Sequence, residues 1–441
     1  MSRKGRWSAR EIARRALRRV ESQGVFASAA IDAELEAAPG VDPRERGLAT
    51  ELVYGTLRHR DRLDRALGAQ APRGIGKLAP QMRTILRVAA YQLLMLDRVP
   101  DHAAVDDAVR AARKLGGNRM AGFANAVLRK VATSGEPPLP RASDDPMASV
   151  CATYSLPRWI AGRIRDGVGD EELVAAAAAL SAPAPLSIRV NSLRATLDQV
   201  IHRLPVDCPG VEVERSPACP GGLLVRGLGA PERSPSFVDG WWTVQDTGAQ
   251  RVSLLAAPGS GMCILDACAG VGGKSTHLAE LSGDGADILA VDVSERKLRQ
   301  GAETAARLGL KSIHSLCVDL LDPNAGQQVD GEFDLVVIDA PCSGLGVLRR
   351  HPEAKWRVQP EMIAAMAELQ GRMLEALVSR VRPGGALVYA VCTFTEEEGP
   401  AQIERLTRRH GAFRLDGPAL STWPHRDDAD AFYAARLVRA P

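Results

Sequence analysis

Residues 263–292 read CILDACAGVGGKSTHLAELSGDGADILAVD, and this stretch decides the fold of the second half of the chain. Two short apolar runs, each ending in aspartate, flank a glycine-rich turn and a helical pattern. Unbroken apolar runs of this length are typical of buried parallel strands. Three more runs follow with helical patterns between them: SIHSLCVD (312–319), FDLVVIDA (333–340) and ALVYAVC (386–392). The alternation predicts a doubly wound α/β domain over residues 240–441, with its ligand at the carboxyl ends of the strands.

The sequence before residue 240 contains two regions with different secondary-structure patterns. Residues 1–140 show helical patterns only, from a capping box at Ser8 and Glu11 to a glycine stop at 116–117. Residues 145–239 mix patterns: PLSIRVNSL (185–193) alternates like a strand, TLDQVIHRL (196–204) is helical, and VEVERS and GLLVRG are short strands. We therefore expect a multidomain protein with an all-α N-terminal domain, a small α+β unit and a Rossmann-like α/β domain.

The charge is distributed unevenly along the 441 residues. Residues 1–140 carry 25 Lys and Arg against 15 Asp and Glu, a net charge of +10, whereas the whole chain has a net charge of +3. A basic domain attached to a mildly acidic remainder favours contact with a polyanion such as RNA. No apolar run is long enough for a membrane span and no signal sequence is recognisable, so we expect a cytoplasmic protein that does not bind membranes. A monomer is assumed.

The glycine-rich turn after the first strand predicts a cofactor site. Its spacing, Asp266-x-Cys268-x-Gly270-x-Gly272, is not the dinucleotide fingerprint, and the spacing before Lys274 is not that of a P-loop. It fits the shorter loop that holds the methionine part of S-adenosylmethionine. Three further aspartates, Asp292, Asp319 and Asp339, end the following three strands. We expect Asp292 to bind the ribose hydroxyls and Asp319 to meet the adenine edge. The predicted cofactor residues are Cys268, Ala269, Gly270, Val271, Gly272, Gly273, Lys274, Asp292, Asp319 and Asp339.

Two cysteines follow neighbouring strands at the same predicted edge. Cys342 lies in a Pro-Cys-Ser-Gly turn after the fourth strand, three residues beyond Asp339, and Cys392 follows the fifth strand. A thiolate that adds to C6 of cytosine activates C5 for methylation, an acid near N3 and N4 favours that addition, and a second thiol can assist product release. We predict Cys392, Cys342 and Asp339 as catalytic residues. The other cysteines form no C-x-x-C pair and have no histidine cluster near them, so we expect no metal; apart from Cys268, we assign them to the core.

Five segments of the α/β domain resemble the RNA cytosine-C5 methyltransferase family that includes the bacterial Sun and Fmu proteins. They are WWTVQDTGAQ, LDACAGVGGKSTHLAEL, AVDVSERKL, DAPCSGLGVLRRHPEAKWR and YAVCTFTEEE. The resemblance implies that Cys392 is the nucleophile, that Cys342 helps to release the product, and that S-adenosylmethionine is the methyl donor. PLSIRVNSL and YSLPRWI resemble the small RNA-binding unit that precedes this catalytic domain.

Residues 1–135 resemble NusB-type RNA-binding domains through LATELVYGTLRHR, ILRVAAYQLLMLDRVP and FANAVLRK. The order of the three units is similar to that of the family members that act on small-subunit (16S) ribosomal RNA, which makes this RNA the expected substrate. The sequence departs from the family pattern at Gly270-Val271, at Val391, at Gly399-Pro400 and in DADAFYAARL near the C-terminus. These departures remove no reacting group.

Three alternatives were weighed. A DNA cytosine methyltransferase uses the Pro-Cys thiol for attack and carries a Glu-Asn-Val segment, which this chain lacks. A tRNA cytosine-C5 methyltransferase remains open on motifs alone. An inactive RNA-binding adaptor of antitermination type fits the N-terminal domain, but the presence of Asp339, Cys342 and Cys392 argues against inactivity.

Overall fold

The computed structural model describes residues 7–71, 74–322 and 328–441. The chain forms two compact units. Unit 1 contains residues 1–181 and the short segment 350–357, and unit 2 contains residues 182–349 and 358–441. The border at Ser181 falls inside the expected small α+β domain. No helix among the described residues is long and apolar enough to span a bilayer.

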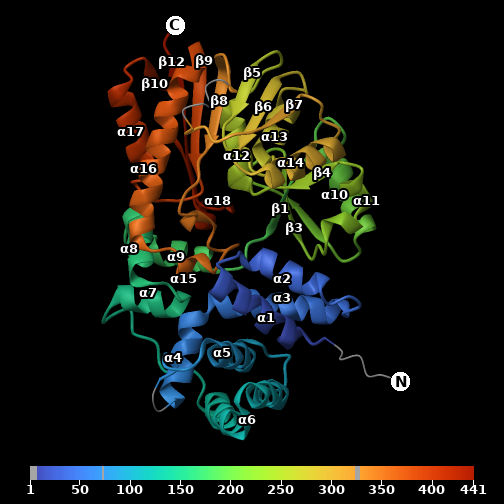
Figure 1. Ribbon diagram of the computed structural model, residues 1–441, viewed down its shortest axis with the longest axis vertical. Helices are drawn as coiled ribbons and strands as arrows, with labels where there is room; N and C mark the ends of the chain where they lie inside the picture. The colour runs from blue at the N-terminus through green and yellow to red at the C-terminus, as the bar shows by residue number, and fades with distance from the viewer. Residues whose placement is uncertain (1–6, 72–73, 323–327) are drawn as a thin grey trace. The chain divides into compact units, whose positions relative to one another are not determined.

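Unit 1 is built from helices throughout its described residues, as the sequence predicts for the N-terminal domain (Figure 1). They are α1 (Ala9–Gln23), α2 (Ala27–Glu36), α3 (Pro43–Arg58), α4 (Arg60–Gln70), α5 (Pro80–Met95), α6 (Asp101–Ser134), α7 (Pro146–Tyr154), α8 (Arg158–Val168), α9 (Leu173–Ser181) and α15 (Ala354–Arg357). The Ser8 side chain accepts a hydrogen bond from the Glu11 amide, and α1 ends at left-handed Gly24. The predicted glycine stop is a kink inside α6, where Gly116 and Gly117 leave helical geometry.

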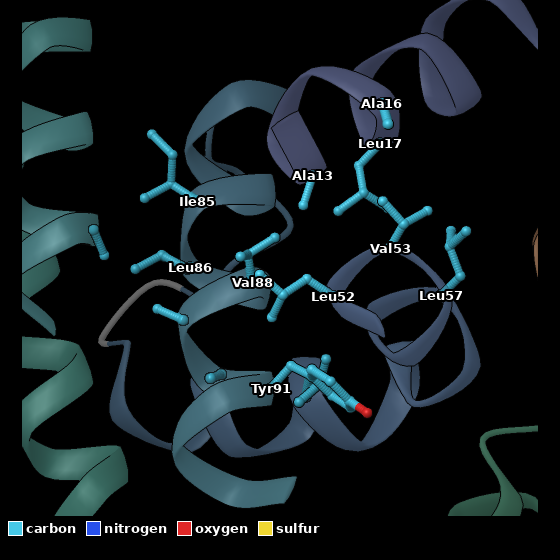
Figure 2. Close-up of a cluster of buried hydrophobic side chains, with 14 of the residues drawn as sticks. Ala13, Ala16, Leu17, Leu52, Val53, Leu57, Ile85, Leu86, Val88 and Tyr91 are labelled. Carbon is cyan, nitrogen blue, oxygen red and sulfur yellow. The ribbon is translucent and has the colours of Figure 1, made fainter. Parts of the chain in front are cut away.

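The core of unit 1 lies where α1, α3 and α5 pack together. Figure 2 shows Ala13, Ala16 and Leu17 of α1 against side chains of α3 and α5, among them Leu52 and Val88. The small alanine side chains on α1 let the neighbouring helices approach closely. Burial of such an apolar face stabilises a helical bundle by about 25 cal/mol per Å².

Segment 350–357 belongs to unit 1 although it follows the Pro-Cys-Ser-Gly turn in the chain. Glu353 Oε1 accepts a hydrogen bond from the Ala27 amide at 2.9 Å, and the Trp356 ring nitrogen donates to Leu57 O at 2.7 Å. Lys355 is fully buried, and its ammonium group donates to Tyr154 O at 3.0 Å, at the end of α7. Burial and the charge of Arg58 lower the pKa of Lys355 to about 7. The segment is therefore an integral part of the helical unit.

Unit 2 contains a small antiparallel sheet with the strand order β2-β3-β1-β4. The strands are β1 (Leu186–Val190), β2 (Glu212–Arg215), β3 (Gly222–Arg226) and β4 (Trp242–Val244), and α10 (Leu197–Asp207) packs with them. This confirms the α+β character expected for the region. Arg189 of β1 reaches the helix after the glycine-rich turn, because its Nε and Nη2 atoms each donate to Glu280 at 2.8 Å. Both side chains are almost fully buried, so this bidentate ion pair fixes the small sheet to the larger one.

The larger sheet has the order β10-β12-β9-β8-β5-β6-β7, with β11 beside β12. Its strands are β5 (Cys263–Asp266), β6 (Asp287–Asp292), β7 (Ile313–Cys317), β8 (Phe333–Asp339), β9 (Val381–Val391), β10 (Phe413–Leu415), β11 (Leu420–Thr422) and β12 (Phe432–Arg439). The five predicted strands, β5 to β9, are parallel, and β12 adds to β9 in the antiparallel sense. The doubly wound prediction is confirmed, and the C-terminal antiparallel strands extend it.

Alternate residues of the central strands face opposite layers of helices. Ile264 and Val337 pack with α12 (Thr247–Ala256), α13 (Gly273–Leu281) and α14 (Glu295–Leu308), while Leu265 and Val336 pack with α16 (Pro360–Leu377) and α17 (Pro400–Arg409). Because both faces are covered, the strands are apolar along their whole length. The polar residues therefore collect where the strands end.

Candidate active site

The two predicted catalytic thiols lie side by side. Cys342 follows β8 and Cys392 follows β9, and these strands are parallel neighbours in which Asp339 pairs with Ala390. The two Sγ atoms are 3.3 Å apart, and both cysteines are free thiols. Fifty residues of sequence thus separate two sulfur atoms that are in hydrogen-bond contact.

The environment gives the two thiols different properties. The hydrogen bond to Cys392 and burial together raise the pKa of Cys342 well above its usual value. Cys342 consequently keeps its proton at neutral pH and can donate it toward the Cys392 sulfur. A thiol that donates to a neighbouring sulfur stabilises negative charge there.

The carboxylate of Glu398 joins the loops that carry the two thiols. It accepts hydrogen bonds from the Ser343 amide at 2.7 Å, from the Ser343 hydroxyl at 2.6 Å and from the Thr395 hydroxyl at 2.9 Å. Gln370 of α16 donates to the same carboxylate at 3.2 Å and to Pro341 O at 2.9 Å. Glu398 is completely buried. It belongs to the run Glu396-Glu397-Glu398, and it was not among the residues that the sequence predicted for the site.

Close backbone packing also holds the Cys392 loop. The Gly346 amide donates to Cys392 O at 3.0 Å, and Gly346 O accepts from the Ala431 amide at 3.0 Å. A Cβ atom at position 346 would lie 1.9 Å from Ala431 O and 2.8 Å from Cys392 O. Only glycine fits there, so the turn after Cys342 can approach the other loop without steric conflict.

We expect Glu398→Ala to lower turnover by about 100-fold, because a displacement of about 1 Å between reacting groups can cost that much. Buried donors on Ser343 and Thr395 would lose their acceptor, so the thermal unfolding midpoint should fall as well. The rate at which iodoacetamide alkylates Cys392, read by mass spectrometry, reports on the thiol environment directly. Glu404→Gln, a change on the exposed face of α17, is the matched control. An unchanged alkylation rate and turnover for Glu398→Ala would show that this carboxylate does not position the thiols.

Lys274 and Asp339 form an ion pair near the thiols. The Lys274 Nζ atom lies 2.5 Å from Asp339 Oδ2, and the Lys274 side chain is buried. Burial alone would lower the pKa of Lys274, but the charges of Asp339 and Asp266 outweigh it and raise this pKa. Lys274 therefore stays charged beside the Asp339 side chain. We assigned Lys274 to the cofactor loop, and the structure brings it to the carboxylate that was predicted to act on the base.

A cavity of about 450 Å³ lies at the carboxyl ends of the parallel strands. Its lining includes most of the polar residues predicted to bind the cofactor: Cys268, Gly270, Asp292, Asp319 and Asp339. Leu320, Leu369 and Met373 add apolar walls. Pockets for small cofactors combine such walls with a few polar groups. The predicted residues Ala269, Val271, Gly272, Gly273 and Lys274 are not among the residues that line this cavity.

The glycine-rich loop is shaped by its contacts on both sides. Asp292 Oδ2 accepts from the Gly270 amide at 3.0 Å, and Asp292 Oδ1 accepts from the Ser294 amide at 2.8 Å. Gly272 has φ +79°, and a Cβ atom there would lie 3.0 Å from the Cα atom of Gly301 in α14. The loop thus needs glycine at position 272 both for its backbone angle and for its contact with α14.

The residues of this site fit S-adenosylmethionine. Asp266, at the end of β5, is fully buried, and its Oδ2 atom accepts from the Ser275 hydroxyl at 2.6 Å, while Oδ1 has no hydrogen-bond partner among the described atoms. Burial raises the pKa of Asp266 to about 6. A buried carboxylate oxygen without a donor is suited to an ammonium group such as that of a methionine moiety. The exposed Asp319 lies on the rim of the cavity.

We expect Asp292→Asn to weaken S-adenosylmethionine binding by about 10- to 100-fold, because hydrogen bonds to a charged acceptor contribute about 1.5–3 kcal/mol. The carboxamide introduced at position 292 would also bring its own N–H donors against the backbone N–H groups of Gly270 and Ser294, which now donate to the carboxylate. Calorimetric titration with S-adenosylmethionine measures the effect. Asp287→Asn, at the exposed opposite end of β6, is the control. Equal affinities for the two variants would contradict a role of Asp292 in the cofactor site.

Two assignments of cysteines to the core are wrong. Cys263 and Cys317 are exposed, since Cys263 is the first residue of β5 and Cys317 is the last residue of the edge strand β7. Cys219 is buried as expected, and Cys151 and Cys208 are half-buried. Apolar runs predicted the strands correctly, but they did not show which strand lies at the edge.

The C-terminal segment that departs from the family pattern has a structural role. Asp430 forms a hydrogen-bonded ion pair with Arg349, which lies seven residues beyond Cys342, and both side chains are buried. Arg349 also lies 3.5 Å from Asp246 at the start of α12. Nearby, the Lys274 ammonium group lies 5.6 Å from the centre of the Phe432 ring. These contacts hold the loop after Cys342 and were missed by sequence reasoning.

The other departures are compatible with the fold. Gly270 has φ +57° and its amide is used by Asp292, while Val271 is exposed. Val391 is buried at the end of β9. Pro400 is the first residue of α17, a position where proline is favoured. Among the residues that the structure describes, no three His, Cys, Asp or Glu side chains gather in a way that suits a metal ion.

Comparison with known proteins identifies the class. Residues 253–438 match the family model described as 16S rRNA methyltransferase RsmB/F, residues 8–133 match the NusB family, and residues 156–229 match the ferredoxin-like domain of RsmF/B-like methyltransferases. These matches define a methyltransferase whose catalytic domain follows two accessory domains.

Full-length relatives make the identification specific. The chain is 34% identical to the probable ribosomal RNA small subunit methyltransferase B of Synechocystis over 98% of this chain and all of that protein. It is 32% identical to the Bacillus subtilis protein of the same description, over 93% of this chain and 90% of that protein. The crystal structure of PH0851 superimposes with a TM-score of 0.82 at 25% identity, over 97% and 98% of the two chains. The chain belongs to the RsmB/F family of 16S rRNA methyltransferases.

Proposed function

We propose that this protein transfers a methyl group from S-adenosylmethionine to C5 of a cytosine in small-subunit ribosomal RNA. The observation that carries the proposal is the pair of free thiols 3.3 Å apart at the ends of adjacent parallel strands. A single nucleophile would serve most group transfers, but addition to a pyrimidine C6 also requires a later step that breaks the carbon–sulfur bond. A second thiol in contact with the first is suited to that step.

In the proposed reaction, the Cys392 thiolate adds to C6 of the cytosine and electron density moves to N3 and C5. The ion pair of Lys274 and Asp339 would neutralise charge that develops on the N3 and N4 side of the ring. When bound, S-adenosylmethionine would supply an electrophilic methyl group for C5. Asp292 and the backbone of the glycine-rich loop would hold it, and the free oxygen of Asp266 would accept from its ammonium group.

Product release requires loss of the C5 proton and cleavage of the bond between C6 and the Cys392 sulfur. Cys342 holds its proton because of its contact with Cys392 and its burial, so it can donate that proton to the departing thiolate. The C5 proton passes to water, and the electron pair of the C5–H bond re-forms the C5–C6 double bond as the bond between C6 and sulfur breaks. The cytosine has to be unstacked for the thiolate to approach C6 from above the ring plane.

The test is bisulfite sequencing of ribosomal RNA and tRNA from cells with and without the gene, followed by methylation of the unmodified RNA by the purified protein. We expect one or a few small-subunit rRNA cytosines to lose protection in the deletion strain and to regain it in vitro. Loss of 5-methylcytosine from tRNA alone would replace the rRNA substrate by tRNA. No change in either RNA, together with no methyl transfer in vitro, would overturn the proposal.

Two alternatives have less support. A tRNA substrate is compatible with the reaction chemistry, but the similar full-length proteins are described as small-subunit rRNA methyltransferases. An inactive RNA-binding adaptor has no need for two thiols in contact or for a buried Lys274–Asp339 pair beside them.

A further inference from the structure

Unit 1 contains a cavity of about 1080 Å³, more than twice the volume of the cofactor cavity. It is lined by the middle of α1, the start of α4, the start of α5 and the segment 350–357, all within this unit. The lining contains six arginines: Arg15, Arg18, Arg19, Arg60, Arg83 and Arg357. Only three acidic residues share the surface: Glu21, Glu34 and Glu353. The groove therefore has an excess of positive charge.

The acidic residues of the groove are already occupied. Glu34 contacts Arg15 at 2.7 Å and Arg19 at 3.4 Å, and Glu21 pairs at 2.8 Å with Arg87, which does not line the groove. The charges of Glu34 and Glu21 are thus committed to local ion pairs, whereas Glu353 uses one carboxylate oxygen to accept from the Ala27 amide.

Three of the arginines have no carboxylate partner among the described residues. Arg18 is exposed, Arg83 donates to Gly76 O at 3.2 Å, and Arg357 donates to Gly24 O at 2.9 Å. Neighbouring guanidinium groups repel one another, so keeping several in one concave surface costs free energy unless an anion enters it. Their arrangement points to a polyanionic ligand.

Aromatic side chains hold two of the guanidinium groups in place. The Arg60 guanidinium lies 5.1 Å from the centre of the Trp356 ring, and that of Arg357 lies 4.7 Å from the centre of the Phe26 ring. A stacked arginine keeps its N–H edge free for a bidentate contact with phosphate oxygens. The groove is thus preorganised for phosphodiester groups.

We propose that this arginine groove binds the phosphodiester backbone of the RNA substrate. The inference rests on the proposed function for the identity of the RNA and adds the place where the helical unit holds it. The cavity is larger than the roughly 300–1,000 Å³ typical of small-molecule pockets, and arginine is its most frequent lining residue, which suits a nucleic-acid backbone. Arg357 follows Cys342 by only fifteen residues, so one side of the groove is built by the chain that carries the second thiol.

The test compares two double variants of the full-length protein that remove the same charge. The groove variant, Arg18→Ala/Arg83→Ala, removes two guanidinium groups that have no carboxylate partner among the described residues. The control variant, Arg113→Ala/Arg119→Ala, removes two exposed arginines of α6 that lie outside the groove. Binding of a small-subunit rRNA transcript is measured by filter retention across a series of NaCl concentrations. Circular dichroism melting verifies that both variants are folded.

We expect the groove variant to lower the slope of log K against log salt by about 1.4–1.8 units, which is about 0.7–0.9 for each of the two lost phosphate contacts. At 0.1 M salt its affinity should fall by roughly 10- to 50-fold. The α6 variant should keep the wild-type slope. Equal slopes for all three proteins, or an equal loss in both variants, would overturn the proposal.

Binding and methylation report on separate claims in this experiment. If wild-type protein forms 5-methylcytosine but the groove variant binds RNA with an unchanged slope, the groove is refuted and the proposed reaction stands. If the groove variant shows the expected loss of slope while wild-type protein forms no 5-methylcytosine, the groove is supported and the proposed reaction fails.

Discussion

Replacement of Cys392 by alanine should reduce methyl transfer by at least about a thousandfold, because the reaction loses the only group that adds to C6. Cofactor binding should change little. The cavity that fits S-adenosylmethionine is lined by Asp292, Asp319 and the glycine-rich loop, and Cys392 is not part of its lining. A tritium-transfer assay on unmodified small-subunit rRNA measures the first quantity, and calorimetry measures the second.

Cys263→Ala is the matched control for this experiment. Cys263 is an exposed free thiol at the first position of β5, so its loss removes a cysteine from the same domain without altering the candidate site. The control should retain wild-type turnover. Substantial turnover by Cys392→Ala would contradict its role as nucleophile, and a parallel loss of cofactor binding would indicate that the variant is misfolded.

Replacement of Cys342 by alanine should trap the protein on its RNA. Cys392 would still attack and the methyl group would still be transferred, but the departing thiolate would lack the proton that Cys342 supplies at 3.3 Å. A denaturing gel should then show an RNA-dependent band of reduced mobility. We expect release to slow by about 10²–10⁴-fold, the range for loss of a general acid.

The double variant Cys342→Ala/Cys392→Ala should form no such band, because no sulfur remains to make the bond. The two thiols act in sequence, so the effects of the single changes on turnover should not add. If the band appeared with Cys392→Ala and not with Cys342→Ala, the roles of the thiols would be reversed. That outcome would contradict the asymmetry inferred from the raised pKa of Cys342.

Much of the fold could be predicted from the sequence because the signals are local. The central strands β5, β6 and β8 are mostly apolar, the first helix has a serine cap and a glycine stop, and the paired glycines at 116–117 interrupt α6. The residue at which a strand ends is also recognisable in the local sequence. Because neighbouring parallel strands have their carboxyl ends at the same edge of a sheet, Cys342 and Cys392 were predicted to lie at one edge. The prediction of two adjacent thiols depends on this rule alone.

The residues that hold the site were not predictable, because their partners are distant in sequence. Glu398 looks like the last of three solvated glutamates, yet it is buried beneath Ser343, 55 residues away. Asp430 and Arg349 pair across 81 residues, and Arg189 meets Glu280 across 91. A charged residue in a polar run gives no local sign of burial, so only the tertiary structure distinguishes Glu398 from its neighbours.

The membership of segment 350–357 in unit 1 has a consequence for synthesis. An N-terminal domain ordinarily folds as soon as it leaves the ribosome, at about 5–20 residues per second. Unit 1, however, receives its last eight residues only after the 168 residues 182–349 have been made, a delay of about 10–30 s at those rates. Until then the amide of Ala27 and the carbonyl groups of Leu57 and Tyr154 lack the partners that the segment provides. The nascent helical unit is completed only once translation has passed both the glycine-rich loop and the first of the two thiols.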